Sequence, residues 1–348
     1  IEIYSSSDIT FSNVNVYSTL GMAYQGWFNT RIQVIDSKLT RPPLGSAYDY
    51  GHSAQYGFSG AADGFNMANS SYIKFENNEW AYAGDDAINI HDNICSSTAF
   101  SAANNTITVD NTGTQYPMYS GNTVELHNAD FSPLLSNGNP WVGTISSVNG
   151  AVITFSTPLP SSVPNGTLLF NDSVATHHYI VRNNNIHDNK VRGLLTHCAD
   201  GTIQDNFFSS NYCNGMMIGC VTYKYEEGFC PSNIIVRGNV WSHNNIQGSK
   251  STFSGFMNSD VSMFGVFGGP TLTAYPICQD ILFEYNTIDS SPYAALQVNS
   301  ATNVVLYNNL IQYPCQKGTS YSSGSVEFIG VGGLVSSPVI GVPTSVGY

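Results

Sequence analysis

A short motif that recurs along the chain limits the possible folds more than any other feature of the sequence. It consists of an apolar residue, two residues of any type, an asparagine, one further residue and a second apolar residue. Six copies are centred on Asn78, Asn184, Asn206, Asn239, Asn286 and Asn309, and two earlier copies on Val14 and Ser37. Neighbouring copies lie 22 residues apart at 184 and 206, and 23 apart at 14 and 37 and at 286 and 309. The repeat unit is therefore 22 or 23 residues, lengthened elsewhere by loops.

This period predicts a coiled sheet. The β-branched and aromatic residues of the motif favour strands, and asparagine tolerates the left-handed backbone of a tight turn. Amide side chains on successive coils can stack as a hydrogen-bonded ladder. No stretch has the period of an amphipathic helix. We therefore expect an all-β chain folded as a right-handed parallel β-helix, with an ordinary β-sandwich as the alternative.

An insertion interrupts this repeat. The 106 residues from Asn78 to Asn184 exceed one 23-residue coil by 83 (106 − 23). The excess contains short alternating segments at 106–109, 122–126, 142–145, 151–155 and 167–170, separated by Gly, Pro and Asn. This pattern is typical of a small antiparallel barrel. We expect the first part of the β-helix at residues 1–94, the inserted β-barrel at 95–176, and the second part with a C-terminal tail at 177–348.

Two further spacings are longer than one unit. The spacing of 33 from Asn206 to Asn239 adds about ten residues (33 − 23), around 223–228. The spacing of 47 from Asn239 to Asn286 holds either two coils or one coil with a long loop through 265–276.

Composition narrows the choice of partner. Charged residues make up 10% of the chain and the formal net charge is −13. This argues against nucleic acid and anionic membranes, because both attract clustered Lys and Arg. No run of about 18 apolar residues is present, which argues against a membrane span. A neutral oligosaccharide or polysaccharide fits better, and the absence of C-x-x-C or His-rich spacing predicts no metal site and no cofactor.

Seven cysteines in a chain with few charges indicate an oxidising compartment and predict a secreted, extracellular protein. Cys198 lies six residues after Arg192 and Cys220 six after Asn214, so the two should occupy adjacent rungs. A rung spacing of about 4.8 Å suits a disulfide between them, with Cys220–Cys230 as the rival pairing. Potential glycosylation sequons begin at Asn69, Asn104, Asn165 and Asn171.

Five segments align when residues are counted from the repeated asparagines. They are D-G-F-N-M (63–67), D-A-I-N-I (86–90), R-G-L-L-T (192–196), N-G-M-M-I (214–218) and A-A-L-Q-V (294–298). The first position should face outward, and it is filled by Asp63, Asp86, Arg192, Asn214 and Ala294. The second is always Gly or Ala, which keeps a crowded turn small. The third is always apolar and should face inward, so Asn66, Asn89 and Gln297 at the fourth face outward.

The aligned acids predict an active site. Asp63 and Asp86 lie 23 residues apart, with Asp85 one step before, so all three carboxylates should crowd neighbouring rungs about 4.8 Å apart. Like charges at that distance raise at least one pKa, which supplies an acid near neutral pH. A lone Asp-Gly or Asp-Asp is usually a turn, and a lone arginine a surface ion pair. The shared register favours glycosidic bond hydrolysis, with Arg192, Asn214, Asn66, Asn89, His91 and Gln297 binding the sugar.

The string GDDAINIH (84–91), followed by a barrel-like insertion and then VRGLLTH (191–197) and YEEGF (225–229), resembles glycoside hydrolase family 110. YSTLGMAYQ (17–25) resembles a segment before that family's first Asp, and the resemblance spans roughly residues 9–312. The family's members are exo-acting α-1,3-galactosidases. The resemblance implies Asp85 as general acid, Asp63 and Asp86 as activators of water, and Arg192 and Glu226 as sugar ligands. Asp92 departs from the family's usual Gly, and 226–228 match its loop loosely.

These observations predict a secreted, metal-independent, inverting glycoside hydrolase that removes a terminal α-linked galactose. The acid and base of an inverting enzyme are separated by about 6.5–9.5 Å, which carboxylates splayed from adjacent rungs should reach. Tyr82, Tyr223 and Tyr225 are candidates for stacking on a sugar face. The alternatives are an endo-acting α-glucanase of the dextranase or α-1,3-glucanase type, and a non-catalytic β-helical glycan-binding module.

Overall fold

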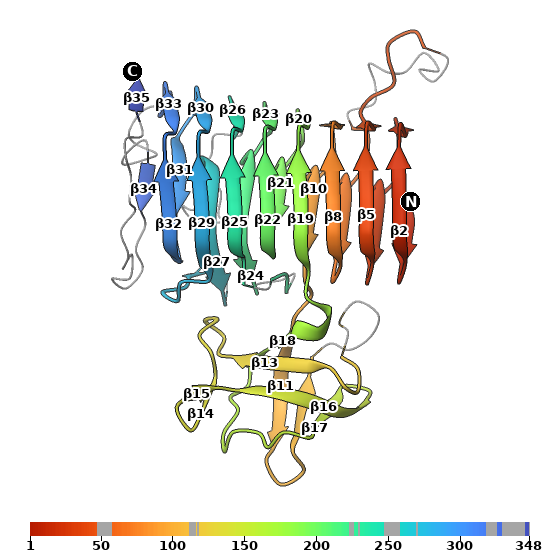
Figure 1. Ribbon diagram of the computed structural model, residues 1–348, viewed down its shortest axis with the longest axis vertical. Helices are drawn as coiled ribbons and strands as arrows, with labels where there is room; N and C mark the ends of the chain where they lie inside the picture. The colour runs from red at the N-terminus through yellow and green to blue at the C-terminus, as the bar shows by residue number, and fades with distance from the viewer. Residues whose placement is uncertain are drawn as a thin grey trace.

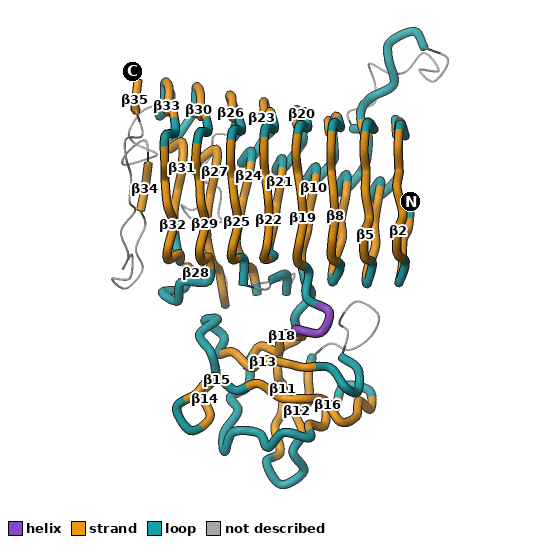
Figure 2. Tube along the Cα trace, in the orientation of Figure 1, coloured by secondary structure: helices purple, strands orange, loops and turns teal. Residues whose placement is uncertain are grey.

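The chain forms a right-handed parallel β-helix with an antiparallel β-barrel inserted into it (Figures 1 and 2). This computed structural model describes residues 1–46, 58–110, 116, 118–222, 226–228, 230–246, 258–268, 271–317, 326–328 and 345–347. Each coil except the last contributes one strand to each of three parallel sheets, here named A, B and C in the order in which a coil visits them; the last has described strands in A and C alone. The fold predicted from the repeat is confirmed, and the β-sandwich is excluded because strands of successive coils pair in parallel.

The strands of each sheet follow one another along the axis of the β-helix. Sheet A comprises β1 (Glu2–Tyr4), β4 (Tyr24–Trp27), β7 (Phe65–Ala68), β10 (Ile88–His91), β21 (Leu194–Thr196), β24 (Met216–Val221), β27 (Ser259–Phe267), β31 (Ala294–Val298) and β34 (Val326–Phe328), and β28 (Thr271–Leu272) pairs with β27. Sheet B comprises β2 (Ser7–Ser12), β5 (Thr30–Ile35), β8 (Ser71–Glu76), β19 (His177–Arg182), β22 (Ala199–Gln204), β25 (Ser232–Arg237), β29 (Cys278–Glu284) and β32 (Ala301–Tyr307). Sheet C comprises β3 (Asn15–Val16), β6 (Lys38–Leu39), β9 (Glu79–Ala81), β20 (Asn185–His187), β23 (Phe207–Ser209), β26 (Val240–Ser242), β30 (Thr287–Asp289), β33 (Leu310–Gln312) and β35 (Ser345–Gly347).

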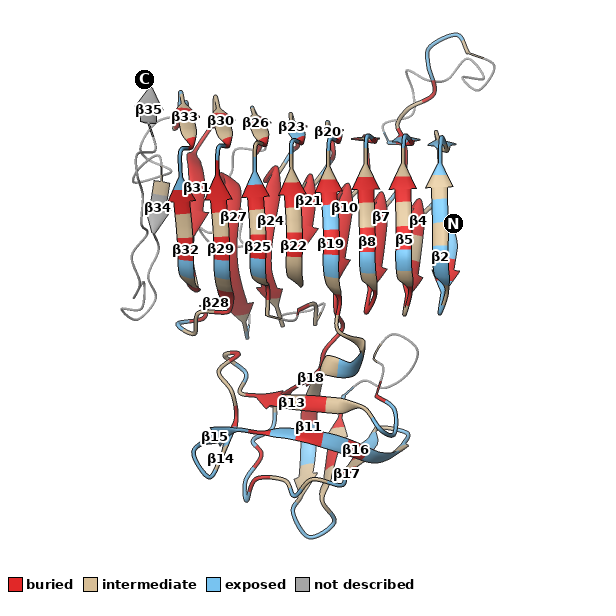
Figure 3. Cartoon of the chain, viewed as in Figure 1, coloured by how far each residue is buried: buried red, intermediate tan, exposed pale blue. Residues whose placement is uncertain are grey.

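The interior of the β-helix is filled by the residues that the alignment placed inward. The third-position side chains are 0–1% exposed and belong to one apolar core: Phe65, Ile88, Leu194, Met216 and Leu296. The second position must be small, because a Cβ on Gly64 would lie 2.5 Å from the carbonyl oxygen of Ala87 on the next coil. Figure 3 shows buried residues along sheet A and alternating burial along the strands of sheet B.

The repeated asparagines form a buried ladder along the turn between sheets B and C, here called the Asn ladder. Nδ2 of each asparagine donates to Oδ1 of the next, over 2.9–3.1 Å, from Asn78 through Asn184, Asn206, Asn239 and Asn286 to Asn309. Each Oδ1 also accepts from a backbone N–H on the preceding coil, as Asn206 Oδ1 does from Asn184 N at 3.0 Å. A second, shorter ladder runs through Asn189, Asn211 and Asn244. Stacked amides therefore satisfy polar groups that the turns would otherwise bury unpaired.

The spacing of 47 holds one coil, since β25 pairs directly with β29 and β26 with β30. Its sheet A strand, β27, pairs with β24 and β31. This coil breaks the aligned pattern: the residue between Ser259 and Val261 is Asp260, which is fully buried. Counting eight residues from Asn239 reaches Gln247, whereas the first position of this coil is Ser259, 20 residues after Asn239 (259 − 239), so the alignment missed it.

The insertion is a closed barrel with its own apolar core. Its strands pair in the order β11 (Cys95–Ser101), β12 (Thr106–Val109), β17 (Val152–Phe155), β16 (Val142–Asn149), β13 (Thr123–His127) and β18 (Leu168–Asn171). A hairpin of β14 (Leu135–Ser136) and β15 (Asn139–Pro140) and the 3-10 turn η1 (Asp172–Val174) complete it. Phe131, Leu168 and Phe170 pack into the β-helix core, and Thr273 Oγ1 donates to the Asp130 carbonyl at 2.6 Å. These contacts hold the barrel against one side of the β-helix (Figure 1).

The predicted disulfide is wrong. No disulfide joins any two of the seven cysteines. Cys198, which follows β21, and Cys220, which lies within β24, do occupy adjacent rungs as predicted, because β21 pairs with β24. However, Cys198 Sγ donates to the Ile90 carbonyl at 3.4 Å, and Cys220 Sγ packs against Gly228, where a Cβ would lie 3.2 Å away. The thiols therefore contact different neighbours, and the rival Cys220–Cys230 pairing is absent as well.

The four sequons differ in exposure. Asn69 and Asn171 are buried, and their Nδ2 atoms donate to Asp92 Oδ1 and Asn122 Oδ1. Asn104 and Asn165 are exposed on the barrel. Glycosylation at Asn104 and Asn165 stays a prediction compatible with this exposure. Among the described residues no helix has the length and apolar character needed to cross a membrane.

Candidate active site

Three sheet A strands place the predicted first-position residues on successive rungs. Phe65 of β7 pairs with Ile88 of β10, which pairs with Leu194 of β21. The backbone continues this register, since Gly64 N donates to the Asp86 carbonyl at 2.9 Å and Ala87 N to the Arg192 carbonyl at 2.9 Å. One winding of the chain therefore brings residues 23 and 106 positions apart into contact.

Asp63, Asp85 and Asp86 form one acidic cluster. One carboxylate oxygen from each lies within 4.8 Å of the others. Asp63 accepts from Asn66 Nδ2 at 2.8 Å through Oδ2 and from Asp86 N at 3.2 Å through Oδ1. Asp86 Oδ1 accepts from Arg192 N at 3.0 Å and Nε at 2.7 Å. Asp63 and Asp86 are 6% and 2% exposed, and Asp85 is the most accessible of the three.

Burial and crowding favour a bound proton in this cluster. Burial, followed by repulsion from Asp86, raises the pKa of Asp63 well above its usual value. Burial also raises the pKa of Asp86 to about 6, although the Arg192 guanidinium opposes the shift. Burial alone would lower the pKa of Arg192, but the attraction of Asp86 outweighs it and raises that pKa. The arginine therefore stays charged, and the cluster combines one cation with carboxylates that resist ionising together.

A second group of side chains lies at the other end of the same strands, and the sequence analysis found only part of it. His197 follows β21 and lies one rung from His91, because its backbone N–H donates to the Ile90 carbonyl at 3.0 Å. Glu227 lies 3.9 Å from His91 Nε2 and 3.5 Å from His197 Nε2. Burial would raise the pKa of Glu227, but the two histidines and Arg192 overcome this and lower it to about 2. Glu227 is thus a fixed negative charge in the site.

Asn66 connects the two groups. Its Nδ2 donates to Asp63, and its Oδ1 lies 3.2 Å from His91 Nε2. Asn89 is its neighbour on the next rung, and its buried Oδ1 has no hydrogen-bond partner among the described residues. Asn66, Asn89 and His91 are only 4–6% exposed, so the outward face of sheet A is much less open here than the alignment predicted.

Other predicted sugar ligands lie elsewhere. Glu226 turns to the barrel, where its Oε1 accepts from Ser96 Oγ at 3.2 Å, so the glutamate beside His91 is Glu227 and not Glu226. The bridge between Asn93 and Glu227 fixes which of the two side chains faces the histidines. Asn214 is fully buried, and its Nδ2 donates to the Ser259 carbonyl at 2.5 Å. Gln297 is 1% exposed and accepts from Ser262 Oγ at 3.5 Å.

Of the three tyrosines predicted to stack on a sugar face, the structure describes only Tyr82. Tyr82 packs under the Arg41 guanidinium, whose carbon lies 3.9 Å from the ring centroid. Tyr223 and Tyr225 lie outside the described residues.

The carboxylate spacing differs from the expectation for an inverting enzyme. The closest oxygens of the acidic cluster are within 4.8 Å, whereas a separation of about 6.5–9.5 Å is typical when a water molecule sits between acid and base. The expected inversion at the anomeric carbon therefore rests only on the resemblance to glycoside hydrolase family 110, and not on this spacing. The same oxygens form a possible cation site, but Arg192 already donates to Asp86 at 2.7 Å and supplies a positive charge there.

No protein-family model matches the sequence, and no curated protein sequence matches it either. Several solved structures are similar in fold. An exopolygalacturonase from Thermotoga maritima is 9% identical with a TM-score of 0.49, covering 90% of this chain and 50% of its own. The A-module of a mannuronan C-5 epimerase from Azotobacter vinelandii is 10% identical with a TM-score of 0.46, covering 100% and 61%. An α-1,3-glucanase catalytic unit from Streptomyces thermodiastaticus is 12% identical with a TM-score of 0.37, covering 88% and 41%.

All three identities are far below 25% and all three TM-scores are below 0.5, so nothing about this chain's activity follows from them. The chain spans between 41% and 61% of the length of these proteins.

Proposed function

We propose that this chain is a glycoside hydrolase whose acidic cluster cleaves the glycosidic bond of a glycan. The observation that carries the proposal is the meeting of Asp63, Asp85 and Asp86 within 4.8 Å beside a single arginine. Such an arrangement keeps at least one carboxyl protonated near neutral pH, because burial and repulsion raise the pKa of Asp63 and Asp86. Glycoside hydrolysis needs that combination: one carboxylic acid and one carboxylate on the same small surface.

The roles follow accessibility and charge. Asp85 is the most accessible member, and we assign it the proton donation to the leaving oxygen. Asp86, held by Arg192, is the carboxylate that accepts a proton from the attacking water. We place Asp63 beside Asp86 at the water, where it shares the resting proton of the cluster, because burial and repulsion from Asp86 raise its pKa well above the usual value. The water's oxygen adds to the anomeric carbon as the leaving group takes the proton from Asp85.

The substrate proposed is a neutral glycan ending in α-linked galactose. Four carboxylates, the acidic cluster and Glu227, face one arginine in this site, which disfavours an anionic sugar such as a uronate. Arg192, Asn66, Asn89 and Glu227 offer the donors and acceptors that sugar hydroxyls require. The low exposure of Asn66 and His91 supports entry of a chain end rather than the middle of a polymer. The choice of galactose rests on the resemblance to glycoside hydrolase family 110.

An extracellular location remains part of the proposal. The seven cysteines no longer support it, because none of them forms a disulfide. The low content of charged residues and the exposed sequons at Asn104 and Asn165 still support it.

A substrate screen tests this function. The purified chain is assayed on p-nitrophenyl α-galactoside, on an α-1,3-linked galactose disaccharide, on dextran and on α-1,3-glucan. We expect release of galactose from the first two. Cleavage inside either glucan would replace the exo-galactosidase by an endo-glucanase, and binding without turnover of any glycan would overturn the hydrolase. Proton NMR of the first product gives the anomer, where retention would overturn inversion alone.

A further inference from the structure

A column of backbone bulges runs along sheet B, away from the acidic cluster. One residue near the start of each strand has a positive φ of 53–59° and is skipped in the pairing register, as between Ser7–Thr30 and Ile9–Ile32. These bulge residues are Asp8, Arg31, Tyr72, His178, Asp200, Asn233, Asp280 and Asn303. Consecutive residues of a regular strand face opposite sides, but a bulge turns two neighbours to the same side. In β19 the bulge brings His177 and His178 together.

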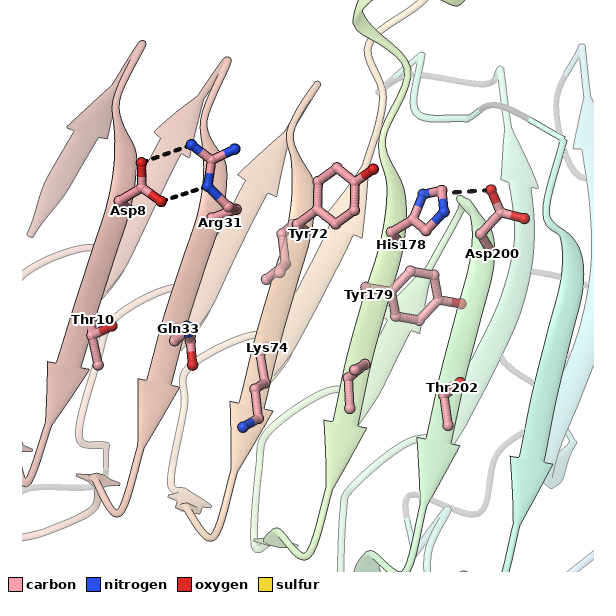
Figure 4. Close-up of a pocket in the computed structure, with 12 residues that line it drawn as sticks. Asp8, Thr10, Arg31, Gln33, Tyr72, Lys74, His178, Tyr179, Asp200 and Thr202 are labelled. Carbon is pink, nitrogen blue, oxygen red and sulfur yellow. Dashed lines mark hydrogen bonds and ion pairs between the residues drawn. The ribbon is translucent and has the colours of Figure 1, made fainter.

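Three metal-binding side chains converge at this bulge. His177 Nδ1 and His178 Nδ1 face each other in hydrogen-bonding contact, and His178 Nδ1 lies 3.8 Å from Asp200 Oδ2 on the next rung. One ligand atom from each residue lies within 4.8 Å of the other two. Figure 4 shows His178 and Asp200 facing each other across β19 and β22. Two facing imidazole nitrogens need a proton or a metal cation between them, because each otherwise presents a lone pair to the other.

Neighbouring side chains hold these groups in place. Asn233 Nδ2 donates to Asp200 Oδ1 at 2.8 Å, which leaves Oδ2 directed to the histidines. The Tyr72 ring stacks on His178 with centroids 4.8 Å apart and an interplanar angle of 21°, and meets His177 edge-on at 5.7 Å. Contacts of this kind orient the ligands of metal sites.

The surroundings leave room and charge for a cation. Tyr72, His178 and Asp200 line a surface hollow of about 660 Å³ that can admit solvent ligands (Figure 4). Arg31 and Lys74, which line the same hollow, are paired with Asp8 and Glu76. These two cations are therefore paired away from Asp200, whose Oδ2 faces the imidazoles.

We propose that His177, His178 and Asp200 bind one divalent transition-metal ion of the Zn²⁺, Ni²⁺ or Cu²⁺ class. Two imidazoles and one carboxylate suit these ions, whereas Mg²⁺ and Ca²⁺ prefer ligand sets made of oxygen alone. The site is separate from the hydrolytic one. The C-x-x-C and His-rich spacings searched for in the sequence could not detect it, because Asp200 lies 22 residues after His178 and meets it only where successive coils stack.

Titration calorimetry with ZnCl₂ on the full 348-residue chain without an affinity tag tests the site. We expect one zinc equivalent that His178→Asn and Asp200→Asn each weaken at least about tenfold. Asparagine tolerates the positive φ at both positions. His243→Asn is the matched control, because His243 is an exposed histidine with a φ of 54°, and its zinc binding should equal that of the unaltered chain.

A second measurement supports the interpretation of the calorimetry. Zinc should raise the melting temperature of the unaltered chain and of His243→Asn but not of the two site variants, which also shows whether each variant folds. If His178→Asn fails to fold, Asp200→Asn decides. Absence of a zinc equivalent, or equal affinity in Asp200→Asn and the control, overturns the site. None of these readouts involves hydrolysis, so they stand whether or not the proposed activity is found.

Discussion

The Asn ladder and the acidic cluster are both columns of side chains stacked on successive rungs, yet they have opposite effects on the protein. In the ladder, each amide donates through Nδ2 and accepts through Oδ1, so identical residues satisfy one another at 2.9–3.1 Å. Ionised carboxylates only accept, so Asp63 and Asp86 cannot satisfy each other and rely on Asn66, Arg192 and backbone N–H groups. The same stacking geometry therefore stabilises the fold in one column and concentrates unfavourable charge in the other.

The largest expected effect is on turnover in the acidic cluster. Asp85→Asn should lower kcat roughly 10²–10⁴-fold on a natural glycan, because it removes the proposed proton donor. An aryl galactoside with a good leaving group should recover much of the loss, since that leaving group needs little protonation. Asp86→Asn should lose activity on both substrates, because the attack of water is impaired.

Asp280→Asn is the matched control, because Asp280 is an exposed aspartate of sheet B. Its turnover should equal that of the unaltered chain. Undiminished turnover of the natural substrate by Asp85→Asn would refute the assignment of that residue as the acid.

The second prediction concerns the ion pair between Arg192 and Asp86. Arg192→Met should lower the free energy of unfolding by about 3–5 kcal/mol, because it leaves the buried Asp86 carboxylate without its cation. Adding Asp86→Asn to this variant should restore much of the loss. Guanidinium unfolding of the two single variants and the double variant measures the coupling, and additive effects would show that the pair makes no net contribution.

The third prediction applies the same logic to the Asn ladder. Asn206→Ala removes the partners of Asn184 Nδ2 and of the Val181 carbonyl, so it should cost at least about 1–3 kcal/mol in unfolding free energy. Turnover at a temperature where the variant is folded should stay unchanged. Asn185→Ala, at an exposed asparagine of β20 that has no positive φ, should cost less than Asn206→Ala. Equal costs would remove the distinction between ladder and surface.

The fourth prediction is a pH dependence of stability at Asp92, where the barrel joins the β-helix. Burial raises the pKa of Asp92 to about 7, although bonds from Thr176 oppose the shift. The folded protein therefore keeps a proton that the unfolded chain releases near pH 3.8. This stabilisation is complete below about pH 3.8 and is lost as the pH rises through about 7.

Thermal unfolding of the unaltered chain and of Asp92→Asn between pH 4 and 8 checks this behaviour. The melting temperature of the unaltered chain minus that of Asp92→Asn should fall as pH rises. Taking this difference cancels titrations that both proteins share, including that of His91, whose pKa is lowered by burial. A difference that does not change with pH would contradict the raised pKa.

Counting residues predicted much of this structure because a β-helix converts sequence period into contact. The repeat predicted the Asn ladder, the inward apolar column and the register that joins Asp63 to Asp86 and Arg192. It failed where the coil length changed or where a neighbouring segment decided the direction of a side chain. Glu226 and Glu227 are adjacent, and only the bridge between Asn93 and Glu227 turns the latter to His91. His197 was detectable from its position one rung after His91.

By itself, the sequence determined the coil, because strands of 22- or 23-residue period can bury their apolar column only by stacking on the next turn. It also determined which acids meet. Tertiary structure alone decided that Cys198 and Cys220 form no disulfide, which glutamate enters the site and how far Asp63 and Asp86 are buried. These properties depend on what covers each rung from outside, and the period carries no information about that covering.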